Sequence, residues 1–384
     1  MRFLDWLRSY DRTYRLLRWM WHLPYNMLLE ASRRLGPVRT PRLGPAKGLY
    51  SEYELVEQRQ IPGRVVYSRQ ESPDMVPGSL RDACGLRQTG CQPWPFFWSH
   101  RRGARLVGRS LALMNEKKRL CAEAVFYQHC LPAEPSYRYL GLPKAVELEG
   151  NWTSVVSRWG YGFHHWWMDV LPRLAVLSEF PRDTRILVYP ELENYQRETL
   201  ELLGLDARVR PTAEPHLLVE NYFFSSPTAM TGCWNPYAVA WLRGCFLKNM
   251  DKDWTPPRRF YIRRIGRHRG LVNESDVIDF LQKRGWTILD LEAMPVRRQI
   301  RLFADAEAVC GLHGAAFTNL LWSRPGCKAL EICASGYLNG VYEGIAGCVH
   351  VEHHHVICPA DSGFHARVDM NQFRQKVELM ERDL

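Results

Sequence analysis

Residues 308–331 read AVCGLHGAAFTNLLWSRPGCKALE, and this stretch predicts a strand, a small-residue turn, a helix and a second strand. Its opening apolar run is typical of a strand that is buried on both faces of a parallel sheet. The Pro-Gly pair stops the predicted helix, and KALEIC is the predicted second strand. The stretch therefore predicts one βαβ unit of an α/β fold.

The turn of this unit is a candidate anion site. His313, Gly314 and Ala315 stand where the helix begins, so that free backbone N–H groups and the positive end of the helix dipole face outward. Glu331 stands near the carboxyl end of the second strand, the sheet edge at which open α/β sheets bind ligands. A phosphate-binding turn beside a carboxylate that can accept hydrogen bonds from ribose hydroxyls indicates a nucleotide-binding site. A unit without a ligand stays open as an alternative, whereas the turn G-L-H-G-A-A, which is not G-x-G-x-x-G, disfavours a hydride-transfer cofactor.

Strand and helix patterns alternate along the chain from residue 185 onward. This alternation predicts parallel, doubly wound sheets. The stretch 251–258, DKDWTPPR, is typical of a linker and marks the predicted domain boundary. Strands are predicted at 185–190, 216–224, 259–265 and 286–292, and helices at 193–203, 236–250, 274–282 and 295–304.

A second informative stretch is 161–178, YGFHHWWMDVLPRLAVLS. In a helix, His165, Asp169 and Arg173 would be spaced i, i+4, i+8 and share one face. An imidazole with a carboxylate one turn away can act as an acid/base pair. Pro172 removes one helical hydrogen bond, which predicts a kink near Asp169. A purely structural His–Asp–Arg network is the alternative.

Both stretches resemble glycosyltransferase family 61. HGAAFTNLLWSRPG is similar to the family signature H-G-A-G-L-T-N-hydrophobic-P-G, and 161–174 is similar to N-Y-x-H-W-L-x-D-x-L-P-R-L, with Gly162 in place of Asn or a related residue. Residues 259–274, RFYIRRIGRHRGLVNE, resemble Y-I-S-R-…-R-…-N-E, with Arg264 at the family's Arg and Arg263 in place of its Ser.

The resemblance implies a GT-B architecture, in which two Rossmann-like doubly wound domains face a cleft, and an inverting transfer from a nucleotide-sugar donor. The resemblance covers about residues 105–342. With the boundary at the predicted linker, residues 36–250 are the expected acceptor-side domain and 251–384 the expected donor-binding domain, whose last helix can pack back on the first. Asp169 is the preferred base with His165 positioning it, and the reverse assignment stays open. The other implied site residues are Arg264, Arg269, Arg263, His313, Gly314, Ala315, Asn319 and Glu331 on the donor side, and Trp166 and Arg173 on the acceptor side. The implied donor is a UDP-sugar, and no cofactor is required.

Composition limits the possible partners. The 384 residues carry a net charge of +10 and are 46% hydrophobic, which argues against disorder and predicts phosphate-bearing partners. No nucleic-acid-binding module is visible, so nucleic acid is not expected. The 11 cysteines include no CxxC pair, which predicts no disulfide framework or zinc site and indicates reduced thiols in a cytosol. The histidines of 350–355, HVEHHH, lack a carboxylate-rich partner motif, and no metal site is predicted there.

The N-terminal segment 1–35 opens with a predicted basic amphipathic helix at 1–24. Its charges recur too often for a signal peptide or a membrane-spanning helix. Its tryptophans and arginines suit an interfacial helix on an anionic membrane, and docking on the protein itself is the alternative. Bacterial members of the family are linked to capsule and other surface polysaccharides. The expectation is a cytoplasmic enzyme, peripheral on the inner face of the cell membrane, that extends a saccharide or lipid-linked saccharide.

Two other classes of function stay open. One is a non-catalytic protein that binds anionic polysaccharide or lipid on the same fold. The other is an NAD-dependent oxidoreductase. Turnover of nucleotide sugars would distinguish a glycosyltransferase from the non-catalytic binding protein. Titration with NAD and with UDP-sugars would distinguish it from the oxidoreductase.

Overall fold

The computed structural model describes residues 49–67, 95–124, 142–228, 234–264 and 269–382. These residues form two β-sheets with helices around them, which confirms the predicted α/β class. The helix predicted at 1–24 lies outside the described residues. Within the described part, no helix combines the length and the apolar character that crossing a membrane requires.

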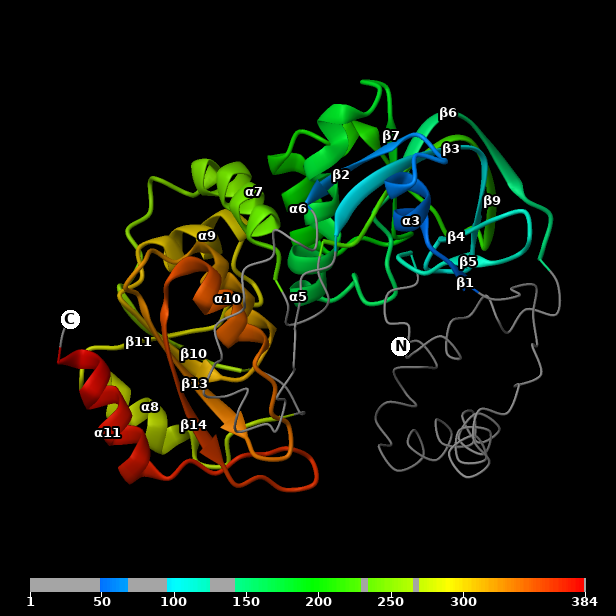
Figure 1. Ribbon diagram of the computed structural model, residues 1–384. Coiled ribbons are helices and arrows are strands. Elements are labelled where there is room, and N and C mark those ends of the chain that lie inside the picture. The colour runs from blue at the N-terminus through cyan, green and yellow to red at the C-terminus, as the bar shows by residue number, and fades with distance from the viewer. Residues whose placement is uncertain (1–48, 68–94, 125–141, 229–233, 265–268, 383–384) are drawn as a thin grey trace, which may run out of the picture. The chain divides into compact units, whose positions relative to one another are not determined.

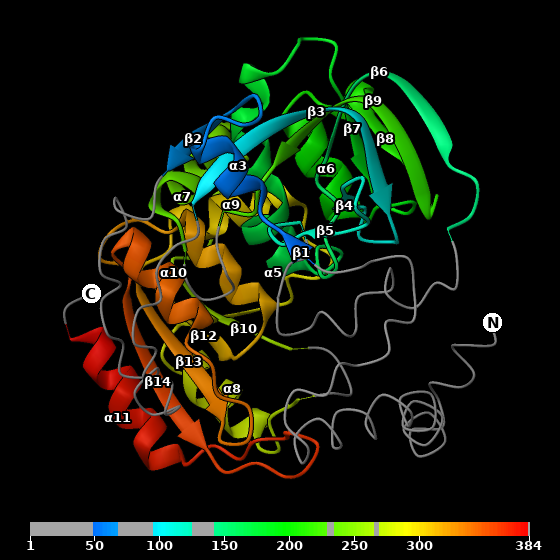
Figure 2. The same ribbon diagram turned by 45° about the vertical axis from the view of Figure 1, so that its right-hand side comes forward.

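The first sheet is mixed (Figures 1 and 2). In spatial order its strands are β1 (Leu49–Tyr50), β5 (Leu120–Cys121), β4 (Ala112–Met114), β3 (Phe96–Val107), β9 (His216–Ser225), β6 (Val146–Ser154), β7 (Arg185–Val188) and β8 (Val209–Pro211), and β2 (Gly63–Tyr67) also pairs with β3. β6 is parallel to β7 and β9, but β3 is antiparallel to β2, β4 and β9. The parallel pairing predicted from residue 185 onward therefore holds for β7 and β8 and for β9 beside β6, but β3 makes the sheet as a whole mixed and not the doubly wound sheet that was predicted. A short loop joins β3 to β4, and such a hairpin makes neighbouring strands antiparallel.

The second sheet is parallel throughout. Its spatial order is β11 (Thr287–Leu289), β10 (Arg259–Ile262), β12 (Ala308–Leu312), β13 (Lys328–Ala334) and β14 (Glu352–Cys358). In chain order these strands are second, first, third, fourth and fifth, so the direction of winding reverses between β10 and β12. This is a doubly wound order, as the strand–helix alternation predicted for this half.

Helices cover both faces of the second sheet. One face carries α8 (Glu274–Gln282) and α11 (Met370–Glu381), which share an apolar cluster with β12 and β13. The other carries α9 (Val296–Ala304), the 3₁₀-helix η8 (Ala315–Trp322) and α10 (Val341–Val349). The last helix thus packs on its own sheet and not, as the resemblance allowed, on the first. Lys328 of β13 fixes it there by donating from Nζ to the Met380 carbonyl at 3.0 Å.

The helices of the first half meet the second sheet through a shared core. Trp167 and Trp322 come from opposite halves of the chain, and their ring centroids lie 4.9 Å apart. Burial of such large aromatic surfaces is a strong stabilising contribution to the packing of the two halves. The remaining helices are α3 (Glu52–Glu57), α5 (Phe163–His165), η4 (Trp166–Val170), η5 (Leu171–Glu179), α6 (Asn194–Leu202), η6 (Asp206–Arg208), α7 (Pro236–Phe246) and η7 (Leu247–Asn249).

The helical segment from α5 to η5 changes its type twice. α5 passes into η4, a π-helix, and then into η5, a 3₁₀-helix. Pro172 lies in the first turn of η5 and has no N–H to continue an α-helical ladder, so the hydrogen-bond pattern changes just before it. Asp169, the residue near which the sequence predicted a kink, thus lies in a π-helical turn.

Candidate active site

A cleft of about 740 Å³ opens where the winding of the second sheet reverses. The chain leaves β10 and β12 in opposite directions, and open α/β sheets bind ligands at such points, beyond the carboxyl ends of the strands. Residues 290–295, which follow β11, form a further wall. The lining residues from the second sheet's edge are Ile262, Arg263, Arg264, Leu312, Gly314, Ala315 and Ala316, and those from the first half are Phe163, Glu193, Asn194, Tyr195 and Glu198.

Arg264 is the best-placed cation in this cleft. Its Nη1 donates to the His313 carbonyl at 2.9 Å, which holds the guanidinium across the turn after β12. A Cβ at Gly314 would lie 2.7 Å from Nη1, so this close approach requires a glycine. Burial and the neighbouring Arg269 lower the pKa of Arg264, but arginine stays charged at neutral pH.

The other predicted donor-side cations have different positions. Arg263 lines the cleft, and its Nε lies 3.6 Å from Glu274 Oε2. Arg269 is not among the lining residues; its guanidinium stacks 4.5 Å from the ring centroid of Tyr337. The structure therefore brings Arg263 and Arg264 to the cleft.

The turn after β12 leads into η8 at the edge of the cleft. Ala315 and Ala316, which open this helix, both line the cleft. The first N–H groups of any helix have no partner within it, so this end remains able to donate to an anion. The helix is of the 3₁₀ type and not the α-helix that the sequence predicted.

Glu331 does not face a ligand. Its side chain is fully buried, one oxygen bonded to His313 Nδ1 and the other 2.9 Å from His353 Nε2. Burial alone would raise the pKa of this carboxyl, but the two imidazoles outweigh burial and lower it to about 2. Asn339 Nδ2 donates to His313 Nε2 at 3.2 Å. The predicted ribose-binding role of Glu331 is therefore wrong, and its carboxylate orients His313 from inside the protein.

Asn319 is also part of the core. Its Nδ2 donates to Gln299 Oε1 at 2.9 Å, and its Oδ1 accepts from Trp322 Nε1 at 3.1 Å. Gln299 Nε2 in turn donates to the carbonyls of Leu291 and Met294 in the cleft wall. Asn319 thus supports the wall from behind and does not contact a nucleotide.

His165 and Asp169 form the predicted pair. His165 Nδ1 lies 2.6 Å from Asp169 Oδ2. The Asp169 side chain is 1% exposed and that of His165 is 26% exposed. Burial raises the pKa of Asp169, and the hydrogen bond from His165 partly offsets this rise. His165 is therefore the member of the pair that can reach a substrate.

The two residues expected on the acceptor side are buried. Trp166 donates from Nε1 to Thr199 Oγ1 at 2.8 Å. Arg173 donates from Nε to the Ser225 carbonyl at 2.9 Å. Arg173 also donates from Nη1 to the Val156 carbonyl at 3.3 Å, and it does not bond to His165 or Asp169. Neither residue can contact an acceptor in this arrangement.

His164 was missed by the sequence reasoning, although it directly precedes His165. It is buried, and its Nδ1 lies 2.8 Å from Thr318 Oγ1 on η8. Burial, followed by the nearby His165 and His313, lowers the pKa of His164 to about 3, so this imidazole is neutral. Its ring centroid lies 5.3 Å from that of His165 and 5.6 Å from that of Tyr342, which lies 5.0 Å from His313. This row of rings links the His165–Asp169 pair to the turn after β12.

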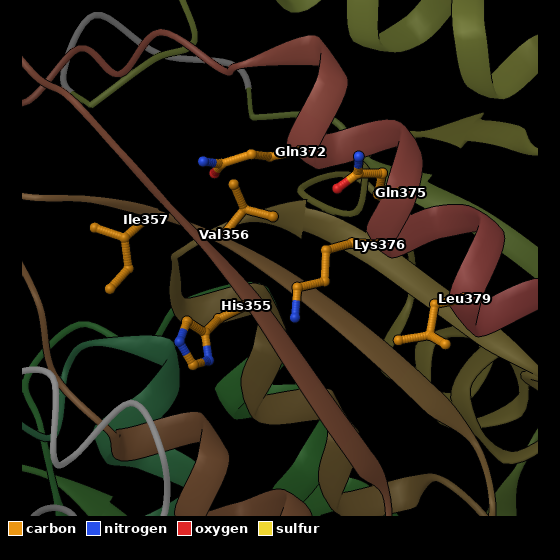
Figure 3. A pocket seen from close by; sticks show the side chains of 7 residues that line it. All are labelled: His355, Val356, Ile357, Gln372, Gln375, Lys376 and Leu379. Atoms are coloured by element: carbon orange, nitrogen blue, oxygen red, sulfur yellow. The ribbon is translucent and has the colours of Figure 1, made fainter.

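The histidines of β14 do not converge on one point. His353 bonds to Glu331, and His354 Nε2 lies 2.8 Å from Glu352 Oε1. His355 instead lines a hollow of about 480 Å³ between β14 and α11, whose other lining residues are Val356, Ile357, Gln372, Gln375, Lys376 and Leu379 (Figure 3). Among the described residues, one group with metal-ligand spacing is His313, Glu331 and Cys333, but His313 and Glu331 already bond to each other.

Comparison with known proteins agrees with this geometry. Residues 163–330 match the family model of Glycosyltransferase 61. No curated protein matches the chain. The matched span begins at α5, contains the His165–Asp169 pair and the whole edge of the cleft from β10 to η8, and ends within β13. The chain therefore carries a glycosyltransferase 61 domain, and the activity of this family is glycosyl transfer from a sugar donor to an acceptor.

Proposed function

We propose that this protein is an inverting glycosyltransferase of GT-B architecture that moves a sugar from a nucleotide-sugar donor to a hydroxyl of a saccharide acceptor. The observation that carries the proposal is the cleft at the winding reversal. One wall presents Arg264 and the start of η8, and the other includes Phe163 of α5, the helix that carries His165. His165 and Asp169 do not themselves line the cleft, but His164, the residue before His165, contacts Thr318 of η8, so the pair lies near this anion site.

The donor's diphosphate would bind to Arg264, Arg263 and the first N–H groups of η8. For the ribose we propose Glu292, which is exposed and lines the cleft just beyond β11. A carboxylate at this position can accept hydrogen bonds from both hydroxyls of a ribose. The buried Glu331 cannot reach a ribose. UDP is the proposed nucleotide, in keeping with the family resemblance.

In the proposed reaction, His165 Nε2 removes the proton from the acceptor hydroxyl. The oxygen attacks the anomeric carbon from the face opposite the nucleotide, and the bond from that carbon to the phosphate oxygen breaks. One such displacement inverts the configuration. Asp169 holds Nδ1–H and stabilises the imidazolium that forms, so it positions the base. Arg264 offsets the negative charge on the departing diphosphate. We therefore propose that the reaction requires no metal ion or cofactor.

For the cellular role we propose assembly of a surface polysaccharide, such as a capsule, or a glycolipid at the cytoplasmic face of the cell membrane. The support is the net charge of +10 together with the basic, aromatic sequence of residues 1–24. The acceptor would then be a saccharide or a lipid-linked saccharide.

Ligand-induced thermal stabilisation tests the proposal. A panel of nucleotide sugars, with NAD as a separate arm, is added to the full chain; a ligand at 100 times its Kd adds about 2.7 kcal/mol of stability. We expect stabilisation by a UDP-sugar, its loss in Arg264→Ala, and its retention in His165→Ala, which should no longer transfer the sugar. Stabilisation by NAD alone, or full turnover by His165→Ala, would overturn the proposal.

A further inference from the structure

Two aromatic side chains project from the turn that precedes α5. Trp159 is 36% exposed and Tyr161 is 59% exposed, the largest value for an exposed large hydrophobic residue in the described part of the chain. Arg158 lies over the Trp159 ring, with its guanidinium carbon 5.2 Å from the ring centroid. Exposed aromatic surface of this kind is typical of a binding site.

The turn is held in one conformation. The Gly162 N–H donates to the Trp159 carbonyl at 3.0 Å, and the Tyr195 hydroxyl donates to the Tyr161 carbonyl at 2.8 Å. Gly160 is buried so closely that an added Cβ would lie 2.1 Å from the Tyr189 hydroxyl oxygen. The exposed rings are therefore carried on a fixed backbone, which limits the entropy lost when a ligand binds them.

The turn also lies next to the proposed base. It leads directly into α5, and a Cβ built on Gly162 would lie 3.7 Å from Cδ2 of His165. Tyr195, which fixes the turn, lines the cleft, and so does Phe163 at the start of α5. The turn that carries the two exposed rings thus lies beside His165, next to two residues that line the cleft, and the proposed donor groups lie on the opposite wall.

We propose that Trp159 and Tyr161 form an acceptor subsite that binds a pyranose ring by stacking. A pyranose has one face of C–H groups, and such a face packs on the electron-rich face of an aromatic ring while the hydroxyls stay available. Stacking at this turn would bring an acceptor hydroxyl towards His165 Nε2. This inference rests on the proposed function and narrows the acceptor class to pyranosides. A membrane surface is the other occupant that exposed tryptophan and tyrosine suit.

Acceptor kinetics test the subsite. The full chain is given a fixed nucleotide-sugar donor, and p-nitrophenyl pyranosides are compared with glycerol as acceptor. We expect Trp159→Ala and Tyr161→Ala each to raise KM for the pyranosides by about tenfold. Donor hydrolysis, donor-induced stabilisation and the KM for glycerol should not change. Trp159→Phe should restore the low KM, whereas Trp159→Leu should not.

Tyr237 supplies a matched control. It is 38% exposed, and its ring packs near Phe96, with the centroids 6.0 Å apart. Tyr237→Ala should leave KM for the pyranosides unchanged. The proposal of an acceptor subsite is overturned if the Trp159 and Tyr161 variants keep the original KM for the pyranosides. It is also overturned if these variants lose only their binding to phosphatidylglycerol vesicles. Because transfer would still depend on His165 in that case, failure of the subsite is distinguishable from failure of the proposed function.

Discussion

The Glu198 carboxylate accepts a hydrogen bond from the Val296 N–H at 2.8 Å. Glu198 belongs to α6 in the first half of the chain, and Val296 opens α9 beside the second sheet. Pro295, the residue before α9, has no side chain that can cap the helix. A carboxylate from the other half therefore caps α9 and satisfies N–H groups that would otherwise lack partners.

Replacement of Glu198 should weaken the contact between the two halves. We expect Glu198→Ala to lower the free energy of unfolding by about 1–2 kcal/mol, the usual cost of a lost helix cap. Urea denaturation measures this change. Glu201→Ala, an exposed site on the same helix, is the control. Equal stability of the two variants would show that the cap contributes nothing.

Replacement of Asp169 should affect the chemical step and leave donor binding unchanged. In Asp169→Asn the partner of His165 Nδ1 loses its charge and no longer stabilises the imidazolium. We expect the transfer rate at saturating donor to fall by about 100-fold. Initial rates and donor-induced thermal stabilisation measure the two effects separately, and Asp206→Asn, at an exposed carboxylate, is the control. A variant that lost donor binding but kept its rate would contradict the assignment.

Replacement of Glu331 should affect stability, whereas replacement of Glu292 should affect donor binding. Glu331→Gln removes a buried charge that two imidazoles require, so the free energy of unfolding should fall by about 3 kcal/mol. Glu292→Gln should leave stability within about 0.5 kcal/mol, as is usual for an exposed site, and should weaken donor binding. Denaturation and donor titration of both variants check this pair. A stable Glu331→Gln protein with weakened donor binding would restore the role that the sequence suggested for Glu331.

His164 should make the protein sensitive to acid. Its pKa falls from an ordinary 6.5 to about 3 on folding, so the unfolded chain binds a proton more readily between these values. Stability should therefore decrease as the pH falls below 6.5, and at pH 5 the loss from this group is about 2 kcal/mol. Denaturation of His164→Gln at pH 7 and pH 5 should show a smaller difference than the original protein. An unchanged difference would rule out a neutral, buried His164.

The sequence predicted those features that depend on spacing within one element. His165 and Asp169 are four residues apart in one helical segment, and their contact needs no knowledge of the rest of the fold. The same is true of β12 and the turn after it, where a buried strand precedes small residues. The parallel strands of the second half were also predictable, because strand and helix alternate there without interruption.

The errors concern partners that are distant in the chain. Glu331 lies in a strand, as predicted, but at the middle of β13 and not near its carboxyl end. Its role depends on His353 of β14, which only the order of the strands brings alongside. Asn319 is similar, because its partner Gln299 belongs to α9. The first sheet was misjudged because β3 folds back on β4 before the alternation begins. His164 had a visible signal, a second imidazole beside the predicted base, but its burial against Thr318 had none.

The π-helical turn η4 restricts how this segment can vary among related chains. It lies between His165 and Pro172, and its wider winding sets the rotation of everything that follows. Insertion or deletion of one residue would rotate the downstream side chains by about 100° about the helix axis. Asp169 would then lose His165, or Arg173 would lose the Ser225 carbonyl. Substitutions should therefore be tolerated here more readily than changes of length, and alignment gaps should fall outside residues 165–173.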